Sequence, residues 1–148
     1  MWVEKVSQQL GRPTRSVAGW LMASKRLKDL VASGKLTLHH CDVAAMPLED
    51  NSVDKVFHCN CYYFWPDLRK GGAEIHRVMK PGGLMVTTLN LSRIAAAGKR
   101  NVFSGENWHP DAYMAALRDS GFTHVRMEDK QDKDATYQVI FATASKCN

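Results

Sequence analysis

The sequence lacks the features that would place it in several specialised structural classes. Nowhere in its 148 residues does an apolar run approach the roughly 20 residues that a membrane-spanning helix needs. The first residues, MWVEKVSQQLGRP, contain no apolar core of the kind found in secretory signal peptides. We therefore expect no membrane partner and a cytoplasmic location, and the length suits one domain with a single core.

Cysteine and histidine are present in small numbers and in no recognisable ligand spacing. The cysteines fit neither a disulfide framework nor a zinc site, which favours reduced thiols. No carboxylate or cysteine completes a metal-binding pattern with the histidines, so no metal site is expected. The residues concerned are Cys41, Cys59, Cys61 and Cys147, and His39, His40, His58 and His76.

Positive charge exceeds negative charge only modestly. The net charge is +5, and the basic residues are scattered apart from short clusters at residues 25–28 and 99–100. Nucleic-acid-binding domains instead gather lysine and arginine in a patch or stripe. We therefore expect a solvated surface and no nucleic-acid partner.

Three β-prone runs organise the middle of the chain. They are residues 36–41, Val53–Cys59 and residues 84–89. Between the second and third runs lies an amphipathic helix, with apolar side chains on one face, followed by a turn at residues 80–83. Strand, helix and strand joined by short turns make a βαβ unit, which predicts an α/β fold with a mostly parallel sheet flanked by helices.

Polar side chains follow two of these runs at the point where each predicted strand ends. Asp42 follows residues 36–41, and Asn60 begins a polar and aromatic cluster that extends to Trp65. In open parallel sheets, ligands bind outside the carboxyl ends of the strands. The binding site is therefore expected near Asp42 and Asn60.

The regions on either side fit helices and a terminal hairpin. Residues 1–13 and 16–33 both carry apolar side chains at helical spacing, and we divide the chain into an N-terminal helix (1–15) and an α/β domain (16–148). Pro110 suits the first turn of a further helix. Two β-prone runs separated by the charged residues 130–134 predict a final hairpin.

Several short motifs in the middle region occur in a fixed order. They are Cys41 to Leu48 (CDVAAMPL), Ser52 to Val56 (SVDKV), Tyr63 to Asp67 (YFWPD) and Glu74 to Gly83 (EIHRVMKPGG). In sequence and spacing they resemble the class I S-adenosylmethionine-dependent methyltransferases, especially the small-molecule branch called type 11. The resemblance implies a Rossmann-like sheet whose final strand runs antiparallel, and methylation of a small molecule.

The resemblance also implies roles for four residues. Asp42 matches the family's acid that binds the adenine amino group, and the backbone amide of Val43 lies beside it for a ring nitrogen. A carboxylate suits an exocyclic amine because it only accepts hydrogen bonds. Asn60 and Cys61 match the residues that line the sulfonium. The resemblance implies no catalytic base, and the acceptor would be selected by loops such as residues 91–107.

The remainder of the family's cofactor site has no counterpart in the sequence. The family carries a glycine-rich loop after its first strand and a ribose-binding acid after its second, yet no G-x-G pattern occurs before Leu36. The ribose acid would fall at Thr14, and Pro13 beside it argues against a central strand. The chain thus resembles an N-terminally truncated member that binds S-adenosylmethionine weakly. The alternative function is a non-catalytic relative with an interaction or regulatory role.

Simpler interpretations of the same residues stay open. Asp42 suits a turn-capping acid, and the aromatic residues from Tyr62 to Trp65 suit packing between sheet and helix. In the family, the two missing strands lie between those matched by residues 36–41 and Val53–Cys59. We predict that these two runs pair directly, since the connection between them is long enough to join parallel neighbours.

Overall fold

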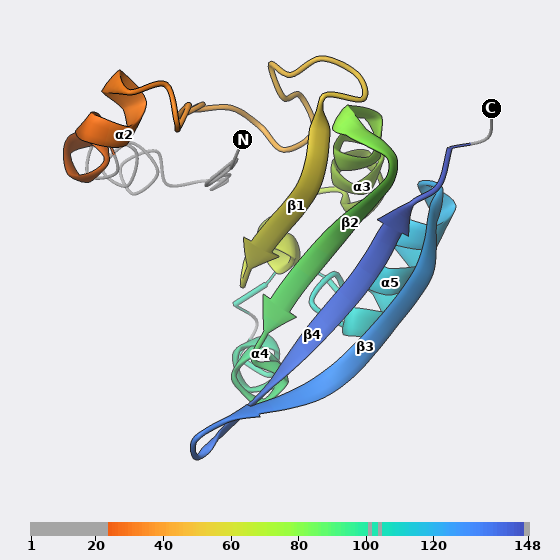
Figure 1. The fold of residues 1–148 in the computed structure, drawn as a ribbon. Helices are drawn as coiled ribbons and strands as arrows, with labels where there is room; N and C mark the ends of the chain where they lie inside the picture. The colour runs from red at the N-terminus through yellow and green to blue at the C-terminus, as the bar shows by residue number, and fades with distance from the viewer. Residues whose placement is uncertain (1–23, 101, 104, 147–148) are drawn as a thin grey trace.

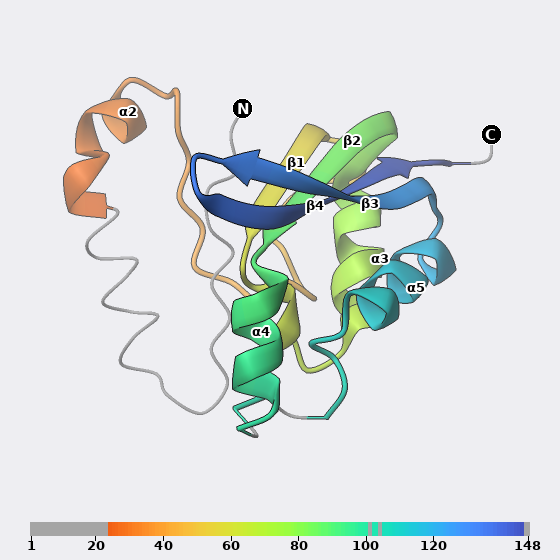
Figure 2. The same ribbon diagram turned by 90° about the horizontal axis from the view of Figure 1, so that it is seen from below.

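A four-stranded sheet with helices against one face forms the body of the structure (Figure 1). The structure is a computed structural model, and it describes residues 24–100, 102–103 and 105–146. Figure 2 shows helices α3 (Leu68–Val78) and α5 (Pro110–Asp119) on the same side of the sheet. In spatial order the strands are β1 (Val53–Cys59), β2 (Met79–Leu89), β4 (Ala135–Ala144) and β3 (Phe122–Asp132).

The sheet is mixed. β1 and β2 run parallel and are joined by α3, whereas β4 runs antiparallel to both of its neighbours, β2 and β3. The predicted βαβ unit and the terminal hairpin are both present, so the α/β fold class is confirmed. No helix in the described part of the chain is both long and apolar enough to cross a membrane.

Helix α3 forms as its sequence pattern predicts. The carboxylate of Asp67 accepts hydrogen bonds from two backbone N–H groups of the first turn, each at 3.0 Å, and so caps the helix. Leu68, Ile75 and Val78 are buried on one face, at the spacing of an amphipathic helix. The helix ends at Val78, where the chain continues directly into β2.

Two adjacent glycines allow α3 to pack closely against its neighbours. A Cβ atom on Gly71 would lie 2.7 Å from Cε3 of Trp65, and one on Gly72 would lie 2.9 Å from Oγ of Ser120. Because these glycines have no side chain, the indole ring of Trp65 and the end of α5 can pack directly against α3.

Residues 80–83, predicted as a turn, interrupt the beginning of β2. Val53 pairs with Met79 and Lys55 with Leu84, so the intervening residues are looped out of the ladder. Gly82 has a φ of +78°, and a Cβ atom on Gly83 would lie 2.8 Å from the carbonyl oxygen of Asp54. Both positions therefore require glycine.

The C-terminal elements agree with the sequence analysis. Pro110 occupies the first turn of α5, and Tyr113 and Leu117 are fully buried. The β3–β4 hairpin turns at Lys133 and the residue after it, and Lys133 has a φ of +54°. Between β2 and α5 lies helix α4 (Leu91–Gly98), at the start of the segment 91–107 that was expected to select the acceptor.

Residues 36–41 form no strand of the sheet, so that prediction is wrong. Their predicted pairing with β1 is wrong as well: among the described residues, β1 pairs only with β2 and forms an edge of the sheet. The alternation of side chains gives these residues a tendency to extend, but a strand also needs neighbouring backbone to bond with.

The helix predicted at residues 16–33 is present in the described residues, which are helical at 24–26 and 28–32; residues 16–23 lie outside them. The described residues contain the short helix α2 (Lys28–Ala32), which buries none of its side chains. Leu30 and Val31 are 43% and 40% exposed, so the predicted apolar stripe has no packing partner there. The predicted helix at residues 1–13 and the boundary at residue 15 lie outside the described residues.

Candidate cofactor site

Asp42 lies in a tight turn that it caps itself. Its Oδ1 accepts a hydrogen bond from the backbone N–H of Ala44 at 2.8 Å, and its carbonyl oxygen accepts one from the N–H of Ala45 at 3.0 Å. The turn-capping interpretation of this acid is therefore correct. The residue is also exposed.

The next residue anchors this turn to the core. The Val43 side chain is 2% exposed and belongs to the hydrophobic cluster that fills the space between sheet and helices. Cys61, from the segment after β1, packs against the same cluster. The two segments predicted to contact the cofactor are therefore both fixed to one hydrophobic core.

The chain leaves β1 through a sharp bend at Asn60. Asn60 has a φ of +50°, and its backbone N–H donates to the carbonyl oxygen of Thr88 on β2 at 3.0 Å. A short 3-10 helix, η1 (Tyr62–Phe64), follows. Of the aromatic side chains here, Phe64 is 42% exposed, whereas Tyr62, Tyr63 and Trp65 are buried. The packing interpretation thus holds for three of them, and Phe64 faces solvent.

A buried polar cluster beneath this bend was missed by the sequence analysis. Nε2 of His58 lies 2.7 Å from Oη of Tyr113 and 2.9 Å from Oγ1 of Thr87, and the two hydroxyls lie 3.0 Å apart. Nδ1 of His58 lies 3.2 Å from Sγ of Cys61. The imidazole thus connects β1, β2 and α5 to the segment that follows Asn60.

Burial determines the protonation of this cluster. It lowers the pKa of His58 to about 4, so the imidazole is neutral at pH 7. It raises the pKa of the Cys61 thiol to about 12, with a smaller contribution from Cys59, so Cys61 is an inert thiol at neutral pH. A histidine with so low a pKa is a poor general base near neutrality, and the cluster is better suited to positioning.

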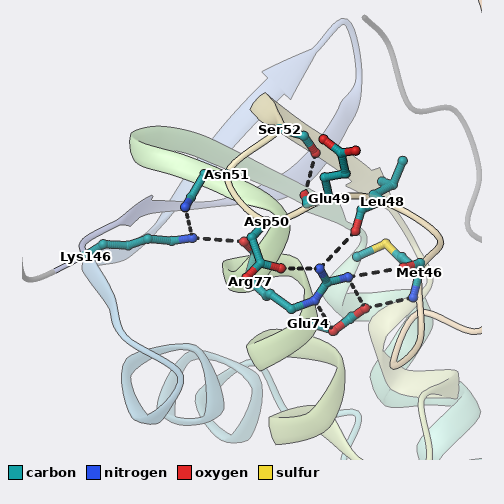
Figure 3. A network of polar contacts seen from close by, with 9 residues as sticks. All are labelled: Met46, Leu48, Glu49, Asp50, Asn51, Ser52, Glu74, Arg77 and Lys146. Carbon is teal, nitrogen blue, oxygen red and sulfur yellow. Dashed lines mark hydrogen bonds and ion pairs between the residues drawn. The ribbon is translucent and has the colours of Figure 1, made fainter.

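The loop before β1 is fixed to α3 by Glu74 and Arg77 (Figure 3). Nε and Nη2 of Arg77 donate to the carboxylate of Glu74, at 2.9 and 2.7 Å. Arg77 also donates to the carbonyl oxygens of Met46 and Leu48, at 3.2 and 2.9 Å, and pairs with Asp50. Side chains of the motif EIHRVMKPGG therefore bind the backbone of the motif CDVAAMPL.

The same network extends to Lys146, after the last strand. Glu74 accepts a hydrogen bond from the N–H of Met46 at 2.9 Å, and Arg77 lowers the pKa of this carboxyl. Nζ of Lys146, after the last strand, donates to Asn51 and to the carbonyl oxygen of Arg77. This explains why the motifs CDVAAMPL and EIHRVMKPGG occur together: each supplies half of one interface.

Two of the residues predicted to contact the cofactor lie on exposed turns. They are Asp42 and Asn60, and no G-x-G sequence accompanies them among the described residues. Within the same residues, no three His, Cys, Asp or Glu side chains gather closely enough to hold a metal ion.

Comparison with known proteins identifies the family. A family model described as a methyltransferase domain, of type 11, matches residues 14–87, which is half of the chain. The chain is 30% identical over 104 residues to the uncharacterized methyltransferase YdaC of Bacillus subtilis (strain 168), covering 70% of this chain and 54% of that protein. It is 41% identical over 54 residues to an uncharacterized chloroplastic methyltransferase of Arabidopsis thaliana, covering 36% of this chain and 15% of that one.

Solved structures agree on the fold. Geranyl diphosphate C-methyltransferase from Streptomyces coelicolor A3(2) superposes with a TM-score of 0.66 at 15% identity, over 86% of this chain and 60% of that one. A protein assigned as a sarcosine dimethylglycine methyltransferase from Galdieria sulphuraria gives 0.65 at 15% identity, over 90% and 67%. The chain spans about half or less of the length of the sequence relatives above. From the family match and the fold together, the chain belongs to the class I methyltransferases, in the type 11 branch.

Proposed function

We propose that this domain serves S-adenosylmethionine-dependent methyl transfer to a small molecule, and that this chain supplies the adenine side of the cofactor site. Family membership supports the reaction class. The observation that carries the assignment is the Asp42 turn, because its carboxylate is exposed and its orientation is fixed by the N–H of Ala44. A pre-oriented acceptor of this kind suits an exocyclic amine.

The residues of the chain bind and orient in this proposal. Asp42 accepts hydrogen bonds from the adenine amino group, and the N–H of Val43 donates to a ring nitrogen. Asn60 and Cys61 lie beside the sulfonium end, on the bend that His58 fixes from below. When bound, S-adenosylmethionine supplies an electrophilic methyl group, and positioning the acceptor is then the protein's main task.

The residues of this chain match only part of the S-adenosylmethionine site, and this limits the affinity that we expect. Hydrogen bonds to charged groups contribute roughly 1.5–3 kcal/mol each. The chain has no matched acid for the ribose and no glycine-rich loop for the methionine. Losing these contacts together weakens binding by several powers of ten, so we expect a Kd no better than about 1 mM.

A second candidate function is a non-catalytic member of the family with an interaction or regulatory role. One structural observation favours it. Strand β1, which leads to Asn60, lies at an edge of the described sheet, so no described strand flanks the ribose side of the site. Such a chain keeps the fold of a methyltransferase without completing the cofactor pocket.

Isothermal titration with S-adenosylmethionine and with adenosine tests the cofactor assignment. We expect both to bind near millimolar Kd, since both carry the adenine, and we expect Asp42→Ala to weaken both alike. Glu49→Ala is the matched control, because Glu49 is an exposed acid on the neighbouring loop and it is its carbonyl oxygen that accepts the hydrogen bond from Ser52. Micromolar affinity for S-adenosylmethionine that survives Asp42→Ala would contradict the proposal.

A methyl-transfer assay separates the two candidate functions. The enzymatic function predicts transfer of a labelled methyl group to small-molecule acceptors at saturating S-adenosylmethionine. The non-catalytic function predicts no transfer above the Asp42→Ala background.

A further inference from the structure

The outer edge of β1 is an unpaired strand edge among the described residues. The strand spans Val53–Cys59, and its one described neighbour is β2. Edge strands carry rows of backbone N–H and C=O groups that can bond to another strand. An edge of this length is long enough to support a pairing between chains.

The register identifies which backbone groups face outward. The N–H of Asn60 donates to Thr88 on β2, and β1 runs parallel to β2. In a parallel pair, alternate residues direct both backbone groups to the same neighbour. The even-numbered residues of β1 therefore bond to β2, and Lys55, Phe57 and Cys59 direct their N–H and C=O groups outward.

The side chains of these outward-bonding residues lie on the open face of the sheet. His58 contacts Tyr113 of α5, so its neighbours in sequence point to the opposite face, over which Figures 1 and 2 show no described helix. Phe57 is 56% exposed there, beside Val86 of β2. An exposed aromatic residue thus lies at the centre of an unpaired edge.

We propose that β1 pairs with β1 of a second copy of this chain, antiparallel and centred on Phe57, to give one continuous sheet. Outward-bonding residues must face each other in such a pair, so Phe57 lies opposite Phe57 and Lys55 lies opposite Cys59. The two phenyl rings then cover each other on the open face, and cross-strand aromatic pairs stabilise a sheet.

Charge favours a second copy as the occupant. In this register Asp54 lies opposite Asn60 and Val56 opposite His58, so no like charges meet across the two-fold axis. The Asp54 carboxylate is held by Lys80 at 2.7 Å within its own chain. The edge therefore matches itself in backbone bonding, and its charges do not oppose the pairing.

Disulfide trapping tests this register directly. Opposed hydrogen-bonded residues have Cα atoms about 5.5 Å apart, within the range that a disulfide spans. Under mild oxidation, Lys55→Cys should therefore cross-link to native Cys59 of the second copy and give a covalent dimer that reductant dissolves. Within one strand the two positions are about 13 Å apart, too far for an internal bond. The control Lys55→Cys with Cys59→Ser should give no covalent dimer.

Sedimentation over a concentration series tests the association itself. We expect a monomer–dimer equilibrium in the native chain, and Phe57→Asp should raise the dimer dissociation constant at least about tenfold. Val102→Asp should leave it unchanged, because Val102 is similarly exposed, at 59%, but is not part of β1. A native chain that stays monomeric, or a dimer that tolerates Phe57→Asp and gives no Lys55→Cys cross-link, would overturn the proposal.

Discussion

The segment before the Asp42 turn and the sheet that begins at Val53 differ in how their residues are packed. Residues 24–41 contain helical residues at 24–26, the short helix α2, which buries no side chain, and no strand of the sheet. The described residues after Val53 form four paired strands and three α-helices around a continuous core. Both segments carry sequence patterns of the same family. The difference shows that a motif adopts its predicted structure only where the elements it packs against are also present.

The loop between these two segments supports this conclusion. Residues 43–52 contain no helix or strand, yet Glu74 and Arg77 bind their backbone at several points. The loop keeps a defined path because its partner, α3, belongs to the same chain. Residues 36–41 have no equivalent partner in the described sheet.

The largest effect within the packed region should come from acid. The pKa of His58 is about 4 in the folded chain and about 6.5 in the unfolded chain. As the pH falls, the unfolded state therefore takes up this proton before the folded state does. The free energy of unfolding should therefore fall as the pH drops from about 6.5 to about 4, by roughly 2–3 kcal/mol. Urea denaturation at several pH values measures this. His58→Gln should remove most of the slope and Thr87→Ser should retain it; an unchanged slope in His58→Gln would contradict the assignment.

Removing Glu74 should have the next largest effect. Glu74→Ala leaves the N–H of Met46 without its acceptor and removes the carboxylate partner of Arg77 on α3, which should cost about 2 kcal/mol of the free energy of unfolding. Glu49→Ala, in the bound loop, should cost less than about 0.5 kcal/mol. Equal losses in the two variants would show that the loop is not held by α3.

Two neighbouring glycines provide a finer test of packing. Gly71→Ala places a methyl group against the rigid ring of Trp65, and the overpacking should exceed the gain in helix propensity by about 1 kcal/mol. Gly72→Ala meets only the hydroxyl of Ser120, which can rotate away. Chemical denaturation should therefore find Gly72→Ala the more stable variant. The opposite order would indicate looser packing of Trp65.

The smallest effect is expected in α2. Leu30 is 43% exposed and no residue of this helix is buried, so Leu30→Ser should change the free energy of unfolding by less than about 0.5 kcal/mol. A loss above about 1 kcal/mol would show that α2 packs against the domain and that the contrast between the two segments is smaller than described.

Local patterns predicted most of the packed region. The apolar face of α3, Pro110 at the start of α5 and the terminal hairpin each depend on residues close together in the sequence. The strand at residues 36–41 was wrong because strand formation depends on a neighbour elsewhere in the fold. The His58, Thr87 and Tyr113 cluster joins three separate elements, and only the position of His58 one residue before the end of β1 hinted at it.

Hydrogen exchange tests the contrast between the two segments most directly. Amides of β2 and β4 lie in paired strands and should exchange only through global unfolding, whereas amides of residues 37–41 should exchange at the earliest labelling times. Peptide-resolved mass spectrometry distinguishes the two regions in one sample. Protection of residues 37–41 equal to that of β2 would contradict the account, because it would place these residues in a stable sheet.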